Sequence, residues 1–192
     1  MRRNRYFLLR HGESVANLSD LIISLPENGL DNYGLSDLGR EQVAENVASS
    51  GLGRDTLVVA SDFLRTRQTA EIAAHTLGAS SPMFDAGLRE RAFGQLEGRS
   101  GYDYVKVWHE DEKDPEHTTF GVESAAALAA RTGAVLERLE REHDKRDILL
   151  VSHGDPLRFL QLHAAGWALT RHLQVRLFTP AEIRPLEELS EP

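Results

Sequence analysis

Three short apolar runs divide this chain of 192 residues, and they constrain its fold more than any other feature. Residues 5–10, 56–60 and 147–152 each have the length and composition of a buried β-strand, and each leads directly into polar residues. Stretches with helical spacing lie between and after them, and helices are expected at 36–48, 63–78, 124–143 and 156–165. Strands that alternate with helices need crossover connections. We therefore predict an α/β fold, a three-layer sandwich with a mainly parallel central sheet and helices on both faces.

The other segments carry weaker patterns. Residues 17–34 lack periodicity and are expected to form a loop, and residues 173–178 alternate weakly, as an edge strand would. The chain from Pro180 onward is rich in Glu and Pro, which predicts a loosely ordered tail. Residues 98–120 are aromatic and acidic, with a short helix expected at 102–109. At roughly 100–200 residues per domain, we predict one domain over 1–192 with an inserted, cap-like segment at about 98–120.

Composition excludes several classes of function. Thirty acidic residues against 22 Lys and Arg leave a net charge of −8, the wrong sign for binding nucleic acid or an anionic membrane. No apolar run is long enough to span a bilayer, and the polar start does not resemble a signal peptide, so a cytoplasmic location is expected. The chain has no cysteine, which excludes disulfides, thiolate metal sites and a cysteine nucleophile.

Polar residues follow each predicted strand at the point where ligands bind in α/β folds, beyond the carboxyl ends of the strands. Two of the strands end in the same dipeptide, His11-Gly12 and His153-Gly154. The glycine permits a tight turn and leaves the histidine at the ligand-binding edge. Arg10 and Arg65 add fixed positive charge and planar donors suited to phosphate. Together these residues indicate a two-histidine site for a phosphate group.

Five segments resemble, in order, the motifs of one protein family. They are LLRHGES at 8–14 with Asn17 after it, SDFLRTRQTAE at 61–71, RERAFGQLEG at 89–98, GVES at 121–124 and VSHG at 151–154. This pattern is similar to that of the histidine phosphatase superfamily, the phosphoglycerate mutase-like proteins. The resemblance extends from Leu8 to about Arg158. It implies the phosphoglycerate mutase-like version of the predicted sandwich.

The resemblance also implies a mechanism. Neutral His11 attacks phosphorus and becomes a phosphohistidine, while Arg10, Arg65 and His153 bind the phosphoryl oxygens. Glu90 protonates the leaving alkoxide and later activates water. His11 needs a free ring nitrogen for this, so its other nitrogen must donate to a neighbouring acceptor. No metal and no cofactor are expected, because arginine and histidine supply the positive charge.

Several residues keep two interpretations. Ser14 and Asn17 match substrate- or phosphate-contacting positions, but Ser14 equally fits a helix N-cap and Asn17 a loop cap. Gly154 is expected at the phosphate site with His153. Glu13 is left without a role. Glu123 and Ser124 are expected to begin a long helix. The histidines expected to be surface or packing residues are His75, His143, His163 and His172.

The aromatic and acidic insertion also allows two readings. His109 and His117, with the acids between them, could form a metal site, but a solvated acidic loop is far commoner and is preferred. Tyr102, Tyr104 and Trp108 either line the substrate entrance or pack the insertion onto the body of the protein.

Hydrolase and mutase activities share this site, and sequence differences favour a hydrolase. Cofactor-dependent phosphoglycerate mutases are longer, with a Trp before the asparagine of the first motif and a His-Tyr-Gly segment after the acid. This chain has Val15-Ala16 and Ala92-Phe93-Gly94 at those places. We therefore expect a metal-independent phosphomonoester hydrolase that acts on a small phosphorylated metabolite. Alternatives are phosphoglycerate mutase-type transfer and a catalytically weak binding module, and the oligomeric state is left open, a homodimer included.

Asp155 departs from the family pattern, in which a small or amide residue is more usual. A carboxylate there would repel a second anionic group on the substrate, unless it faces Arg158 or solvent. This favours a sugar or alcohol phosphomonoester over phosphoglycerate.

Overall fold

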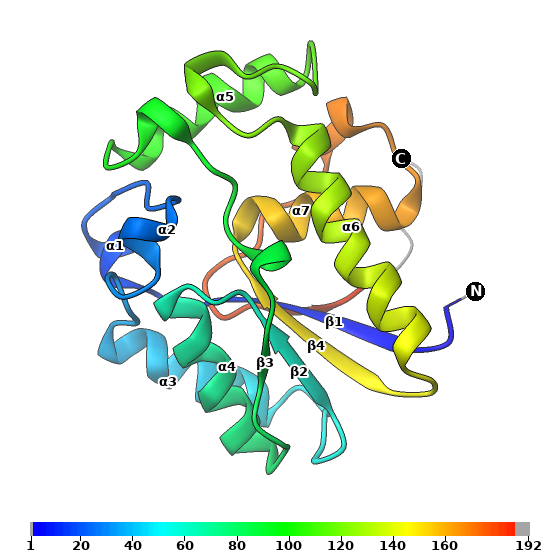
Figure 1. Cartoon of the computed structure of the whole chain (residues 1–192). Coiled ribbons are helices and arrows are strands. Elements are labelled where there is room, and N and C mark those ends of the chain that lie inside the picture. Colours follow the sequence, from blue (N-terminus) through cyan, green and yellow to red (C-terminus); the bar gives the residue numbers. More distant parts are fainter. Residues whose placement is uncertain (1, 187–192) are drawn as a thin grey trace.

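A computed structural model describes residues 2–186 of the chain and shows a five-stranded central sheet with the strand order β3-β2-β4-β1-β5 (Figure 1). The strands are β1 (Arg5–Arg10), β2 (Leu57–Ala60), β3 (Met83–Phe84), β4 (Asp147–Ser152) and β5 (Ile183–Pro185). The neighbours β3, β2, β4 and β1 run parallel, and β5 pairs antiparallel with β1. The prediction of a mainly parallel α/β sheet is confirmed.

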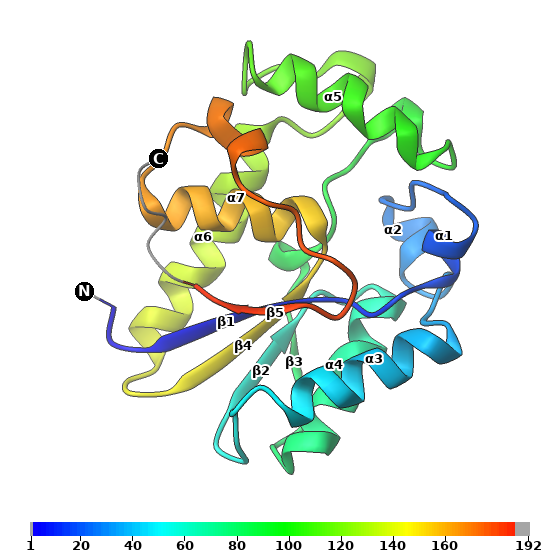
Figure 2. The same cartoon turned by 180° about the vertical axis from the view of Figure 1, so that it is seen from behind.

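Helices cover both faces of this sheet (Figures 1 and 2). The four long helices are α3 (Asp37–Ala48), α4 (Leu64–Leu77), α6 (Ala125–Glu142) and α7 (Gly154–Ala165). Successive side chains of a strand point to opposite faces, and the buried residues of β1 follow this rule. Leu8 packs in the cluster that contains residues of α6 and α7, whereas Leu9 packs in the cluster that contains residues of α3 and α4. The sheet is therefore the middle layer of three.

Local signals explain the helix ends. Ser36 caps α3 by accepting a hydrogen bond from the Gly39 amide, and Ser124 caps α6 by accepting one from Ala127. Gly78 ends α4 in the left-handed conformation, at φ 63°. The predicted helix at 156–165 starts two residues earlier, at Gly154. Pro156 is tolerated there because the first amides of a helix have no partner inside it.

Two segment predictions were wrong. Residues 17–34 do not form a simple loop, because the short helices α1 (Val15–Leu18) and α2 (Pro26–Gly29) reach into this stretch. Residues 173–178 do not form the edge strand. A 3₁₀ helix at Leu169–Gln174 occupies part of that stretch, and Val175 and Phe178 pack into hydrophobic clusters.

The edge strand is β5, so the predicted loose tail is wrong for the residues that pair with β1. Phe7, Leu8 and Leu9 face Pro185, Arg184 and Ile183 across this pairing. Pro is tolerated because this is an edge strand. The rest of the predicted tail, 187–192, lies outside the described residues.

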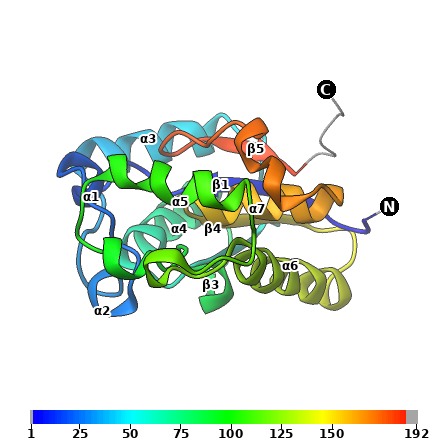
Figure 3. The same cartoon turned by 90° about the horizontal axis from the view of Figure 1, so that it is seen from above.

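The segment 98–120 contains α5 (Tyr104–Asp111), close to the predicted helix, and the short 3₁₀ helices Gly101–Asp103 and Thr119–Gly121. α5 lies beyond the carboxyl ends of the strands in Figure 1, and Figure 3 shows the molecule from that side. Its Val107 packs with Ile22, Phe93, Leu96 and Val122 in a small cluster separate from the two main cores. Within residues 2–186, no helix has the length and apolar composition to cross a membrane.

A buried ion pair holds α5 to the rest of the chain. Both side chains of the pair Arg91–Asp111 are completely buried, and the guanidinium binds the carboxylate through two hydrogen bonds of 2.6 and 2.8 Å. The substitution Asp111→Ala leaves the Arg91 charge unpaired and should lower the free energy of unfolding by about 3–5 kcal/mol. Urea unfolding measures this loss. Glu110→Ala, which removes an exposed pair with Lys113, is the matched control and should stay near wild type; equal losses in the two variants would contradict the prediction.

Candidate active site

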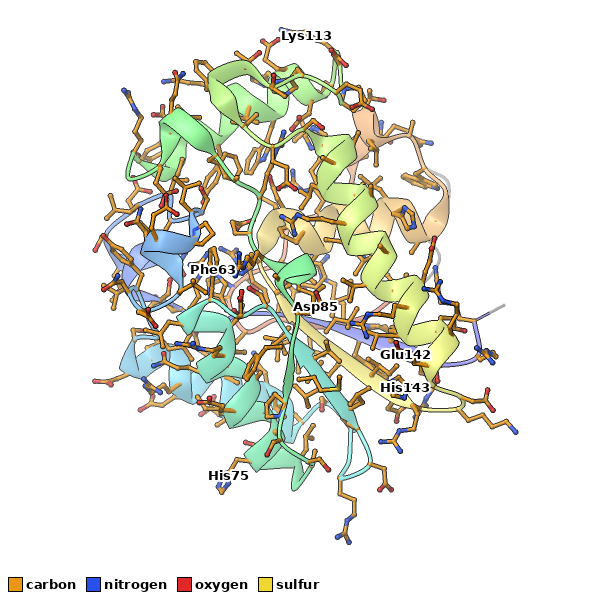
Figure 4. All side chains as sticks on the ribbon, viewed as in Figure 1. Phe63, His75, Asp85, Lys113, Glu142 and His143 are labelled. Carbon is orange, nitrogen blue, oxygen red and sulfur yellow. The ribbon has the colours of Figure 1, made fainter. Side chains whose placement is uncertain are left out.

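Strand register brings the two His-Gly turns together. Arg10 pairs with Ser152 across β1 and β4, so His11 and His153 follow at the same level on adjacent parallel strands. Their ring centroids lie 5.3 Å apart at an interplanar angle of 64°. Phe63, at the start of α4, lies beside this edge of the sheet (Figure 4), with its ring centroid 5.4 Å from that of His153. The two predicted histidines therefore share one buried site.

The geometry of His11 fixes its tautomer. Its Nδ1 lies 2.8 Å from the carbonyl oxygen of Gly12, which can only accept, so Nδ1 carries the proton. Its Nε2 then has a lone pair, and the Arg65 Nε–H donates to it at 3.2 Å. Burial, together with the charges of Arg65 and Arg10, lowers the pKa of His11 well below its usual range. His11 is therefore a neutral imidazole whose free nitrogen lies beside a cation.

The turn that carries His11 is packed backbone against backbone. A Cβ on Gly12 would overlap the Gly39 carbonyl oxygen in α3, and a Cβ on Gly39 would overlap the Glu13 carbonyl oxygen. The Gly12 amide donates to Thr69 Oγ1 at 3.2 Å. Glu13, left without a role in the sequence, accepts a 2.8 Å hydrogen bond from Ser36 Oγ and so stabilises the start of α3.

The two arginines present unpaired donors. Arg65 is 3% exposed and donates from Nη2 to the Ile23 carbonyl, but its Nη1 has no partner within residues 2–186. Arg10 donates from Nη1 to the Phe178 carbonyl at 2.6 Å, and its buried Nε is also without a partner in the described chain. Burial lowers the pKa of both side chains, yet arginine keeps its charge in proteins. Burying unpaired donors on two cations destabilises the folded protein, and an anion bound there would remove that penalty.

His153 is buried and has one free nitrogen. Its Nε2 lies 3.0 Å from Ser61 Oγ, and its Nδ1 has no partner within the described residues. Burial and the nearby charge of Arg65 lower the pKa of His153 well below its usual range. His153 is therefore a neutral imidazole, and the negative charge of a phosphoryl group bound beside it would favour its cationic form.

Glu90 belongs to the same site, where the charges of Arg65 and Arg10 act on it. Its Oε1 accepts a 2.9 Å hydrogen bond from the Arg91 amide. Burial is the main reason that the pKa of Glu90 is raised to about 7, and the neighbouring charge of Asp155 adds to it. A carboxyl group with this pKa can donate a proton near neutral pH and take one back, as a general acid and base must.

Arg131 of α6 holds the Glu90 segment in place, which sequence reasoning missed. Its guanidinium donates to the carbonyls of Gly87, Arg89 and Glu90 at 2.8–3.0 Å. It also binds the carboxylate of Glu123 at 2.7 and 2.9 Å. Glu123 thus does more than begin a helix. No signal in the sequence linked Arg131 to Glu90, because the contacts are to backbone atoms.

A narrow cavity of about 20 Å³ joins these groups. Its lining residues are Arg10, His11, Ser14, Ala16, Asn17, Leu21, Ile23, Arg65, Glu90 and Tyr104. Four of the five residues expected to be catalytic line the cavity: Arg10, His11, Arg65 and Glu90. The fifth, His153, does not line it, but its ring contacts that of His11. Gly154, expected beside His153, is the first residue of α7.

A profile of the histidine phosphatase superfamily (branch 1) matches residues 6–188. The chain belongs to this superfamily. A metal-independent phosphoserine phosphatase from Arabidopsis thaliana is 30% identical over 168 residues, which cover 81% of this chain and 66% of the relative, slightly less than two thirds of its length. A probable phosphoglycerate mutase from Yersinia enterocolitica is 34% identical over 179 residues, 89% of this chain and 78% of the relative.

Solved structures share the fold of this chain. A mycobacterial glucosyl-3-phosphoglycerate phosphatase matches with a TM-score of 0.79 at 23% identity, over 94% of this chain and 88% of the other. A phosphoserine phosphatase from Entamoeba histolytica, in complex with 3-phosphoglyceric acid, matches with a TM-score of 0.76 at 23% identity, over 95% and 89%. The resemblance seen in the sequence motifs is confirmed.

Ser14 and Asn17 serve both as a helix cap and as part of the cavity wall. Ser14 is the N-cap of α1 and accepts from the Asn17 amide, while Asn17 Oδ1 accepts a hydrogen bond from the Ser14 amide, so the two form a capping box. Both residues also line the cavity. The two interpretations left open for them are therefore compatible.

The three aromatic residues of the insertion divide between the two interpretations. Tyr104 lines the cavity, whereas Tyr102 is 85% exposed. Trp108 packs on the body of the protein, with the Arg158 guanidinium 4.7 Å from its ring centroid.

The metal site, the less favoured interpretation of His109 and His117, gains no support from the side-chain positions. His117 bonds to Asp111 at 2.8 Å, and residues 2–186 contain no cluster of three or more metal-ligating side chains. A larger hollow, about 550 Å³, lies at the opposite end of the sheet, where Arg5, Arg54, Lys145 and Arg146 are among its lining residues. It contains none of the groups described above, so the chemistry belongs to the smaller cavity.

Asp155 does not face the substrate side, and the expectation that it directly repels a substrate anion was wrong. Its carboxylate is 4% exposed, accepts a 3.1 Å hydrogen bond from Trp108 Nε1 and lies 3.9 Å from Arg91. It is also absent from the cavity lining. Its charge acts instead on Glu90, whose pKa it helps to raise.

The substitution Asp155→Asn should therefore move the pH profile of hydrolysis. Removing the negative charge lets Glu90 ionise at lower pH, so its pKa falls below about 7 and kcat/KM starts to decline at a lower pH than in the wild type. The profile of kcat/KM between pH 5 and 9 measures the shift. Asp31→Asn, at a carboxylate whose side chain is 86% exposed, is the control; identical profiles for both variants would rule out the coupling.

Proposed function

We propose that this chain is a metal-independent phosphomonoester hydrolase that acts through a phosphohistidine on His11. The observation that carries the proposal is the neutral His11 with a free Nε2, next to two arginines with unpaired buried donors. That arrangement suits attack on a phosphoryl group whose oxygens the arginines neutralise. The metal-independent phosphatase among the relatives supports the same reading.

In the first step, His11 Nε2 forms a bond to phosphorus while the bond from phosphorus to the ester oxygen breaks. Arg10, Arg65 and His153 donate to the three oxygens that carry the charge of the transition state. Protonated Glu90 gives its proton to the leaving oxygen, so the alcohol departs neutral and Glu90 becomes a carboxylate.

In the second step, the Glu90 carboxylate takes a proton from a water molecule as the water oxygen bonds to phosphorus. The bond from phosphorus to Nε2 breaks, which returns neutral His11 and releases inorganic phosphate. Glu90 is protonated again, so each turnover leaves the enzyme unchanged.

Phosphoglycerate mutase activity is the second candidate, because relatives carry that name. The hydrolase is preferred because Val15-Ala16 and Ala92-Phe93-Gly94 replace the segments that mutases carry. The proposal includes one domain over 1–192 with the segment 98–120 as a cap, a small-molecule phosphomonoester as the partner and a cytoplasmic location. Assembly as a homodimer stays open within it.

The test is inorganic phosphate release from a panel of phosphomonoesters in the presence of EDTA, with 3-phosphoglycerate included and its isomers analysed. We expect release that the chelator does not reduce, and an acid-labile phosphoryl group on the enzyme after rapid quenching. Isomerisation without release would assign the mutase instead. Absence of both turnover and enzyme phosphorylation would favour the binding module.

A further inference from the structure

The part of the cavity beyond the phosphate-binding groups has no cation of its own. We call the lining residues outside the phosphate site and Glu90 the outer wall; they are Ser14, Ala16, Asn17, Leu21, Ile23 and Tyr104. Among residues 2–186, Arg10 and Arg65 are the only Lys or Arg residues that line the cavity, and both are engaged in the phosphate site. A substrate with a second anionic group would bring it to a wall of hydroxyl, amide and apolar groups.

The other two buried arginines near α5 contact groups outside the cavity. Arg91 binds Asp111 through two hydrogen bonds, and Arg158 lies over the Trp108 ring and donates to His172 at 3.2 Å, while its Nε has no partner within residues 2–186. Neither of them lines the cavity. A substrate carboxylate would therefore lose water without gaining an ion pair, and it would lie in the same cavity as Glu90.

Tyr104 offers the one aromatic hydroxyl of this wall, and its ring is held firmly. The ring stacks on Trp108 at 5.5 Å and 9°, and it meets the edge of Phe93 at 4.7 Å. Trp108 is itself fixed by hydrogen bonds to Asp155 and His172. Burial raises the pKa of Tyr104, so the hydroxyl keeps its proton, and it makes no hydrogen bond within the described chain.

We propose that the cavity selects small phosphomonoesters of uncharged, hydroxyl-bearing alcohols, and that Tyr104 recognises a substrate hydroxyl. This inference rests on the proposed hydrolase function and names its substrate class. The cavity encloses only about 20 Å³, far below the roughly 300–1,000 Å³ of sites for drug-sized ligands, which favours a small alcohol. Some relatives and structural neighbours are named for phosphoserine or phosphoglycerate derivatives, and these compounds contain a carboxylate. A preference for uncharged alcohols would distinguish this chain from those proteins.

The test compares glycerol 3-phosphate with 3-phosphoglycerate, two esters that differ only by a CH₂OH group in place of a carboxylate. We expect kcat/KM for glycerol 3-phosphate to be higher by about tenfold or more. Leu21→Arg supplies the missing cation and should shift the ratio toward 3-phosphoglycerate by roughly fivefold. Leu21→Gln lengthens the side chain without a charge and should keep the wild-type preference.

Tyr104→Phe tests the hydroxyl. It should lower kcat/KM for glycerol 3-phosphate by about five- to tenfold relative to that for ethyl phosphate, which has no hydroxyl to recognise. An equal loss on both esters would overturn the role of Tyr104. A wild-type preference for 3-phosphoglycerate, or hydrolysis of ethyl phosphate without hydrolysis of glycerol 3-phosphate, would overturn the substrate class while leaving the hydrolase intact. If no ester is hydrolysed and His11 takes up no phosphoryl group, the proposed function itself fails.

Discussion

Replacement of His11 by alanine should lower kcat for phosphomonoester hydrolysis by about 10⁴- to 10⁶-fold. The reason is that the covalent route divides one difficult displacement into two easier ones, and His11 lines the cavity with an unprotonated Nε2 beside the arginines, whereas His153 does not line it. Without His11, a water molecule would have to displace the alcohol from phosphorus directly, in a single step. Phosphate release under substrate saturation measures the loss.

The control for this variant is His75→Ala. His75 is an exposed histidine in α4, far from the active site, and Figure 4 shows it at the opposite end of the molecule from α5. Its replacement should leave kcat unchanged. Substrate binding by His11→Ala should persist, because Arg10 and Arg65 remain, and binding of inorganic phosphate can show this. Turnover by His11→Ala at a substantial fraction of the wild-type rate would refute the phosphohistidine route.

Glu90→Gln should lower kcat/KM for alkyl phosphates by about 10²- to 10⁴-fold and remove the pH dependence that Glu90 imposes. The pKa of Glu90 is about 7, and the protonated form is the one that can protonate the leaving alcohol. Wild-type kcat/KM should therefore fall as the pH rises above about 7. The glutamine cannot donate an acidic proton at any pH, so its activity is low throughout.

The leaving group distinguishes this role from a merely structural one. Nitrophenyl phosphate releases a weakly basic phenolate that needs little protonation, so Glu90→Gln should lose far less activity on this ester than on an alkyl phosphate. Glu71→Gln, an exposed residue of α4, is the matched control. An alkaline decline that survives unchanged in Glu90→Gln would belong to another group, and equal losses on both esters would contradict general acid catalysis.

Much of the site could be predicted because its residues follow short, regular strands. His11 and His153 come directly after β1 and β4, and parallel neighbours end at the same edge of a sheet, so sequence order alone brings them close. The N-caps Ser36 and Ser124 depend on contacts within three residues, which a local pattern records.

The missed features depend on contacts between distant parts of the chain. Arg131 holds the backbone of Glu90 from 41 positions away, and its partners are carbonyl groups that every residue possesses. We expected Asp155 beside the substrate because it follows His153 by only two residues. The first turn of α7 instead directs its side chain toward Trp108. β5 was missed because three residues of an edge strand carry too little alternation to be seen.

The close backbone contact at Gly12 and Gly39 makes these two positions intolerant of substitution. Any substitution at either glycine adds at least a Cβ where a backbone atom already lies, so random mutagenesis should recover almost no active variants there. The outer wall of the cavity is built from side chains, among them Leu21, Ile23 and Tyr104, and these can be exchanged without moving His11. Laboratory evolution toward new leaving groups should therefore accumulate its successful changes at these positions, while the residues that carry the chemistry stay unchanged.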